Sequence, residues 1–221
     1  RSSKLQRIQS QSDFATAVVL LDAAKLRDIS GGKERERRGV YIEYTIQTAG
    51  LAQIGWIRGP GGTSSSGVAA FLPNSDTGDG VGDDDASFGF DGSRGLKFHG
   101  GEKEEETAYG ASLQDSAGLG GWKSGDVLGS YCRFAGSSKM GKSEDDLATR
   151  SYIEIGYTLN GVDLGIAFTV PVDENDAFHF FPALSLNLDE VVDVNIGPEF
   201  AYNRIDGCVG ASQLVMSETT D

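Results

Sequence analysis

The chain has 221 residues, 38% of them hydrophobic, and a formal net charge of −14 at pH 7. This length and composition predict one large domain with a core that needs neither a metal nor a disulfide. The charge is uneven, because residues 1–40 carry +4 and residues 41–221 carry −18. Such an acidic body disfavours binding to nucleic acid or to an anionic membrane, whereas a basic peptide would be tolerated.

The chain has only two cysteines, Cys132 and Cys208, and two histidines. They are too few and too scattered for a zinc site or a disulfide scaffold, so we expect no metal and no cofactor. Buried thiols in a reduced cytosol are the preferred interpretation, which predicts a cytoplasmic protein. No apolar run approaches the ~18 residues that cross a bilayer. Because the chain begins with Arg1, we expect it to be a piece of a longer protein.

Strand signals dominate the chain from residue 41 onwards. Before them, residues 1–12 are polar and basic and predict a loose lead-in, and the apolar run 14–21 fits a strand or a short helix, with its Val pair favouring the strand. The segment 151–168 alternates on both sides of Asn160-Gly161 and predicts a hairpin. Further strands are predicted at 41–48, 51–58, 87–92, 95–100, 126–134, 179–187 and 190–197.

This succession of short strands, without a sustained helical period, predicts an all-β fold, an antiparallel two-sheet β-sandwich. The Gly/Ser/Asp-rich segment 59–85 is expected to be a long loop, either functional or disordered. Residues 206–221 are weakly patterned and are interpreted as a C-terminal tail. The apolar positions of the strands predict a core that includes Ile42, Tyr44, Ile54, Phe90, Ile155, Phe168, Phe181 and Leu184.

One motif raises a nucleotide-binding alternative. Gly136–Ser143 matches the phosphate-loop pattern G-x-x-x-x-G-K-[ST], in which backbone N–H groups surround phosphates. The context is unfavourable, because only about two helical turns would fit before the next strand, and a phosphate loop needs a crossover helix on a parallel sheet. The preferred interpretation is a Gly/Ser/Lys-rich loop inserted into a hairpin.

Several motifs occur in the order in which SPRY domains have them. They are YIEYTI (41–46), LAQIGW (51–56), VGDDDASFGFDGSRGLKFHG (81–100), YG (109–110), W-x-x-GDVLG (122–129), YTLNGVDLGIAF (157–168) and FFPALSL (180–186). The sequence therefore resembles a SPRY domain, most closely that of large RING-type ubiquitin ligases of the Kip-ubiquitination-promoting type. The resemblance assigns residues 38–205 to the SPRY domain, 1–37 to a lead-in with a first strand, and 206–221 to a tail.

The resemblance implies a bent antiparallel sandwich that is non-enzymatic and binds a protein or peptide through loops at one end. It implies substrate or adaptor recognition within a larger ubiquitin ligase. The loops in question are 28–38, 58–85 and 187–189. Asn187-Leu188-Asp189 replaces the Val-Trp-Gly strip of one SPRY subfamily, so the Asn-rich ligand of that subfamily is not expected. The predicted partner-binding residues are Arg37, Arg38, Arg58, Asp83, Asp84, Tyr109, Asn187, Leu188 and Asp189.

Three functional hypotheses therefore remain open at this stage. The first is the protein-interaction module, acting as a monomer when isolated, with no nucleic-acid partner and no membrane partner. The second is a nucleotide-binding protein that uses Gly136–Ser143. The third is a sugar-binding sandwich, because lectins share this architecture and a fold does not fix a function.

Overall fold

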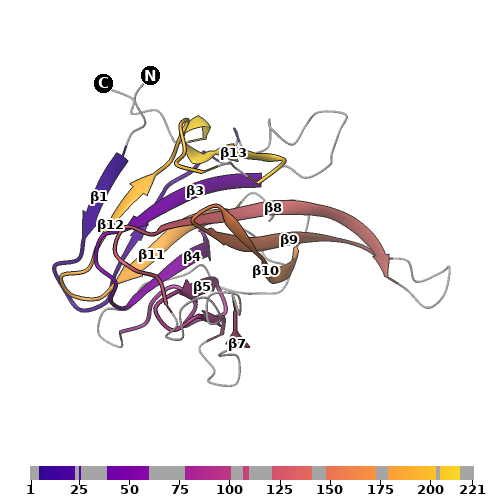
Figure 1. The fold of residues 1–221 in the computed structure, drawn as a ribbon. Helices are drawn as coiled ribbons and strands as arrows, with labels where there is room; N and C mark the ends of the chain where they lie inside the picture. Colours follow the sequence, from indigo (N-terminus) through magenta and orange to yellow (C-terminus); the bar gives the residue numbers. More distant parts are fainter. Residues whose placement is uncertain are drawn as a thin grey trace, which may run out of the picture.

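The computed structural model describes residues 5–22, 25, 39–59, 78–100, 107–109, 121–140, 148–172, 179–202 and 205–214, with the backbone alone at 107–108, 136–140 and 148–150. Within these residues, thirteen strands form two sheets that pack around one core (Figure 1). Neighbouring strands are antiparallel except for β13, which pairs in parallel with β3. The predicted all-β antiparallel sandwich is confirmed.

The larger sheet has seven strands in the order β1-β12-β3-β8-β9-β10, with β13 beside β3. Their bounds are β1 Leu5–Gln9, β3 Gly39–Ile46, β8 Val127–Met140, β9 Ala148–Leu159, β10 Val162–Val172, β12 Val191–Asn195 and β13 Cys208–Gly210. The smaller sheet has six strands in the order β2-β11-β4-β5-β6-β7. Their bounds are β2 Ala15–Val18, β4 Ala52–Arg58, β5 Ser87–Asp91, β6 Leu96–Phe98, β7 Thr107–Ala108 and β11 Phe180–Leu186.

Both ends of the chain contribute strands. Residues 5–9, expected to be part of a loose lead-in, form β1 and pair with β12, and residues 208–210 of the expected tail form β13 beside β3. The expectation of a loose lead-in was wrong for residues 5–9 because β1 turns only Ile8 toward the core, which leaves almost no apolar alternation in its sequence.

The core lies between the two sheets. Six of the eight predicted core residues are fully buried, Phe181 is 9% exposed and Phe168 is only partly buried. Two hydrogen bonds cross the core and join the sheets: Trp56 Nε1 donates to Ser130 Oγ over 2.8 Å, and the Tyr157 hydroxyl donates to the Ile54 carbonyl over 3.1 Å. These bonds satisfy the polar tips of two large buried aromatics.

A second, smaller cluster lies on the outer face of the seven-stranded sheet. Tyr41, Tyr131 and Cys208 are buried there against Phe200 and Ile205. Cys132 belongs instead to the main core, and both thiols are buried, as the sequence predicted, with no disulfide between them.

A buried carboxylate fixes the chain over this outer face. Glu43 is 1% exposed, and its carboxylate accepts hydrogen bonds from the backbone N–H groups of Ala201 and Tyr202, over 2.7 and 3.0 Å. The Tyr41 hydroxyl donates to the same carboxylate over 3.2 Å. Glu43 therefore holds residues 201 and 202 in place. The donors in these three bonds are two backbone N–H groups and a hydroxyl, and none of them is a cation.

The hairpin of β8 and β9 extends past its neighbouring strands as a two-stranded arm (Figure 1). Its outer register runs from Ser137↔Ser151 to Met140↔Ala148. Residues 137–140, expected to lie in a loop, are therefore paired strand. Successive N–H groups of an extended strand point in opposite directions, so this part of Gly136–Ser143 does not form a phosphate cradle. The rest of the motif, residues 141–143, lies outside the described residues.

Candidate partner-binding site

The predicted binding residues do not share one surface. In the β4–β11 pair, Arg58 lies opposite Phe180, whereas Ala52 lies opposite Leu186, directly before Asn187. Six residues of strand, about 20 Å, therefore separate Arg58 from the turn that carries Leu188. The prediction of a single surface is wrong, because the connection after β4 and the turn after β11 leave opposite ends of the same antiparallel pair. Arg37 and Arg38 lie outside the described residues.

Tyr109 is a core residue rather than a contact surface. It is 8% exposed, its ring packs edge-on against Phe90, and its hydroxyl donates to the Gly165 carbonyl over 2.6 Å. Burial raises the pKa of this hydroxyl well above its ordinary value. The expectation that Tyr109 supplies apolar contact to a partner is therefore wrong. Trp122 is also buried.

Asp83 and Asp84 shape the backbone that precedes β5. Asp83 accepts hydrogen bonds from the Gly80 N–H over 2.8 Å and from Gln53 Nε2 over 3.2 Å, and burial raises the pKa of its carboxyl. Asp84 Oδ1 accepts from the Ser87 hydroxyl over 2.6 Å and from the Ala86 N–H over 3.0 Å. Both carboxylates are thus engaged in folding this segment.

The turn after β11 presents an apolar side chain to solvent. The Asn187 N–H donates to the Leu51 carbonyl, and the Glu190 N–H closes the turn on the Asn187 carbonyl, each over 3.1 Å. Asp189 has a left-handed backbone, with φ of 64°. Between them, the Leu188 side chain is 46% exposed.

Hydrogen bonds tie this turn to two neighbouring loops, and one of those loops to a third. The Asp189 N–H donates to the Ser10 carbonyl over 3.2 Å, and the Gly50 N–H donates to the Glu190 carboxylate over 3.1 Å. The Ser124 hydroxyl donates to the Gln47 carbonyl over 2.7 Å. We call this loop group the 187 rim and define it as residues 10–14, 47–51, 123–126 and 187–190.

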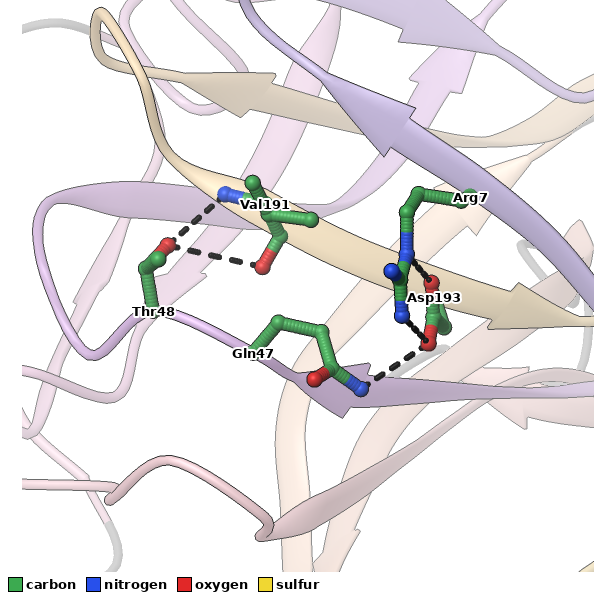
Figure 2. Close-up of polar contacts among 5 residues, drawn as sticks. All are labelled: Arg7, Gln47, Thr48, Val191 and Asp193. Atoms are coloured by element: carbon green, nitrogen blue, oxygen red, sulfur yellow. Dashed lines mark hydrogen bonds and ion pairs between the residues drawn. The ribbon is translucent and has the colours of Figure 1, made fainter.

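Two further contacts fix the strand ends behind the rim (Figure 2). The Val191 N–H donates to the Thr48 hydroxyl over 2.7 Å. The Asp193 carboxylate receives Arg7 Nε and a terminal Arg7 nitrogen over 2.7 and 2.8 Å, and Gln47 Nε2 over 2.9 Å. The hydrogen bonds from Arg7 hold the pKa of Asp193 below its ordinary value.

Sequence reasoning missed these contacts. Arg7 and Asp193 are 186 positions apart, and neither stands in a motif. Only the alternation of residues 190–197 hinted that Asp193 lies on the outer face of a strand. Leu188 and its two neighbours are the predicted site residues that the structure does bring into the rim.

The rim is predominantly acidic. Asp13, Asp126, Asp189 and Glu190 lie in it, against the single cation Lys123. Among the described residues, no group of three or more His, Cys, Asp or Glu side chains is placed to hold a metal ion. The described part of the chain also contains no helix long and apolar enough to cross a membrane.

Comparisons with known proteins give one sequence relative. A scan against models of protein families finds no match. The E3 ubiquitin-protein ligase RKP of Arabidopsis thaliana is 31% identical over 165 residues, which are 75% of this chain and 10% of that ligase. A crystal structure of a human SPRY domain aligns over 90% of this chain and 89% of that chain, with 17% identity and a TM-score of 0.44.

The strands and their order define a two-sheet antiparallel sandwich with a braced loop rim. The similarity to RKP agrees with the resemblance to SPRY domains of large ubiquitin ligases that the ordered motifs indicated, and this chain is similar to part of that ligase. SPRY domains are generally protein-interaction modules. The chain spans about a tenth of the ligase that it matches.

Proposed function

We propose that this domain binds a peptide or protein partner through the 187 rim and has no catalytic activity of its own. The observation that carries the proposal is Leu188, an exposed apolar side chain on a turn that hydrogen bonds hold to Ser10 and to Leu51. An apolar anchor on a rigid support loses little conformational entropy when a partner covers it.

The charge of the rim supports a basic partner. Four carboxylates against one lysine attract a basic segment and repel an acidic one. Such surface charges affect the association rate and the orientation more than the final affinity, so Leu188 is expected to supply most of the binding energy.

At the level of the parent protein, we propose that the domain recognises a substrate or an adaptor for a ubiquitin ligase. The similarity to RKP supports this role. We also propose a cytoplasmic location, which two buried cysteines with no disulfide between them support. A fluorescent fusion of the full-length parent tests the location, and retention in a secretory compartment would contradict it.

Affinity capture with matched variants tests the binding proposal. The immobilised domain is compared with Leu188→Asp and with Leu20→Asp. Leu20 is 61% exposed and follows β2 near the Arg58 end, so it is a control of the same chemistry at the other end of the sandwich. Quantitative mass spectrometry should find proteins that Leu188→Asp recovers about tenfold less well, equivalent to ~1.4 kcal/mol, and that Leu20→Asp retains.

Equal recovery by both variants would contradict the rim as the binding site. The sugar-binding alternative is tested on a glycan array, where we expect no signal. For the parent-level role, the recovered protein should be ubiquitinated by the full-length parent and not by a parent that carries Leu188→Asp.

A further inference from the structure

The two edge strands of the seven-stranded sheet, β1 and β10, differ in whether another strand could pair with them. The β10 edge is closed: the Tyr109 hydroxyl and Lys97 Nζ each donate to a β10 carbonyl, of Gly165 and Ala167, over 2.6 Å. Its pairing with β9 also shifts register twice, and Pro171 has no N–H to offer. Side-chain caps, bulges and proline are devices that stop another strand from pairing.

The opposite edge, β1, has regular strand geometry. It pairs with β12 over five consecutive residues without a register shift. Just beyond it, the Ser10 N–H donates to the Glu190 carbonyl. Since bonding alternates along an antiparallel strand, residues 6 and 8 also face β12, and residues 5, 7 and 9 direct their N–H and C=O groups outward. The Val191 carbonyl accepts from Gln47 on the far side of β12, which fits this alternation.

The side chains of β1 favour an acidic partner strand. Leu5 is 56% exposed, and the Arg7 side chain is 65% exposed. Arg7 binds Asp193 through Nε and one terminal nitrogen, and within the described residues its other terminal nitrogen has no acceptor. The guanidinium is therefore held at the edge of the sheet with donors to spare for a second carboxylate. In the sequence, residues 1–9 contain three basic residues and no acidic one.

We propose that β1 is a docking edge for a partner protein, which adds an extended segment as a further strand of the sheet. The segment places an acidic residue opposite Arg7 and an apolar residue opposite Leu5. Main-chain bonds to residues 5, 7 and 9 supply the affinity, and the two side chains select the sequence. This surface is separate from the contacts proposed for Leu188, so either site can be present without the other.

A second copy of this chain is a poorer occupant. Antiparallel self-pairing centred on Arg7 would put two guanidinium groups directly opposite each other, and like charges in that position destabilise a strand pair. A partner strand with a carboxylate at that position avoids the repulsion and gains an ion pair.

Defined peptides test the proposal without knowledge of the natural partner. The probe is a blocked eight-residue peptide that alternates valine with threonine and carries one central glutamate. Its matched control has lysine in place of the glutamate. In nuclear magnetic resonance titrations at millimolar peptide, the glutamate peptide should bind about fivefold more tightly than the lysine peptide, the scale of a cross-strand charge pair. Exchange of the amides of residues 5, 7 and 9 should slow on binding.

A proline variant tests whether the peptide binds along β1. Gln9→Pro removes an outward N–H and no bond to β12, so the domain should stay folded and lose peptide binding. Ile8→Pro removes an inward N–H and should lower the melting temperature, which checks the assigned direction of the bonds. The thermal melt of Gln9→Pro, followed by circular dichroism, confirms that its loss of binding is not unfolding.

Four results would overturn the proposal. The first is no binding of the glutamate peptide, and the second is equal binding of both peptides. The third is unchanged binding to Gln9→Pro. The fourth is that the edge is already occupied, seen either as slow exchange of residues 5, 7 and 9 in the free monomer or as a dimer that Gln9→Pro dissociates.

Discussion

Single polar atoms in the core determine how the two sheets are joined. The indole N–H of Trp56 has its acceptor in Ser130 on the facing sheet, and Trp56 itself is 0% exposed. A buried donor that loses its only acceptor costs about 1–3 kcal/mol. The Ser130 hydroxyl therefore contributes to the stability of the fold although the side chain buries little apolar surface.

The first prediction is that Ser130→Ala lowers the free energy of unfolding by about 1–3 kcal/mol, because the Trp56 N–H is left without an acceptor. Urea denaturation followed by tryptophan fluorescence measures the change. Ser124→Ala removes an exposed hydroxyl that also donates one hydrogen bond, and it should cost no more than about 0.5 kcal/mol. Equal costs for the two variants would contradict the account of the core.

The second prediction concerns pH. The pKa of Asp193 lies below its ordinary value of 3.8, chiefly because Arg7 donates hydrogen bonds to the carboxylate. The ionised group therefore contributes stability that is fully present above pH 3.8 and is lost as pH falls through the lower folded-state pKa. Below pH 3.8, the wild type should lose stability more steeply than Asp193→Asn. Parallel pH profiles from urea denaturation would show that the contact does not stabilise the fold.

Among the elements, the segment around residue 201 depends on a group from another strand. Glu43 of β3 accepts the N–H groups of Ala201 and Tyr202, although these residues are about 160 positions further along the chain. An acidic residue in the middle of a strand looks solvent-exposed in the sequence, so the pattern gives no hint of this bond.

The third prediction is that Glu43→Gln releases this segment. A glutamine has one acceptor oxygen in place of two and an NH₂ that faces donors, so the variant should lose about 1–3 kcal/mol of stability. Hydrogen exchange at the amides of residues 201 and 202 should accelerate. The exposed Glu199 provides the control, because Glu199→Gln should leave both amides unchanged. Unchanged exchange in Glu43→Gln would refute the anchoring role.

The arm of β8 and β9 is a two-stranded extension of the seven-stranded sheet. Residues 138–140 pair with 148–150 and, within the described residues, with no third strand. The fourth prediction is that deleting residues 138–150 and closing the hairpin with a two-residue turn leaves a folded domain, since loop length changes stability only logarithmically. A deletion variant that fails to show a cooperative thermal melt would mean that the arm packs against the body.

At the scale of the whole molecule, local patterns predicted the strands, and long-range pairing decided their arrangement. The Asn160-Gly161 turn has φ of 49° and 81°, the left-handed pair that its sequence indicated. Alternation also identified both faces of β3. The sequence contains no comparable sign of which loops lie close together. That is decided by the register of β4 and β11, which places Arg58 and Leu188 at opposite ends of the pair. Contacts such as Arg7 with Asp193 arise only once the sheets have formed.

The central claim is that partners bind at the 187 rim rather than at the Arg58 end. Hydrogen exchange of the domain, with and without a protein recovered by affinity capture, tests it most directly. We predict slower exchange at the amides of residues 47–50 and 187–190 in the complex, with no change at residues 55–59. Slower exchange at residues 55–59, with the rim unchanged, would contradict the account.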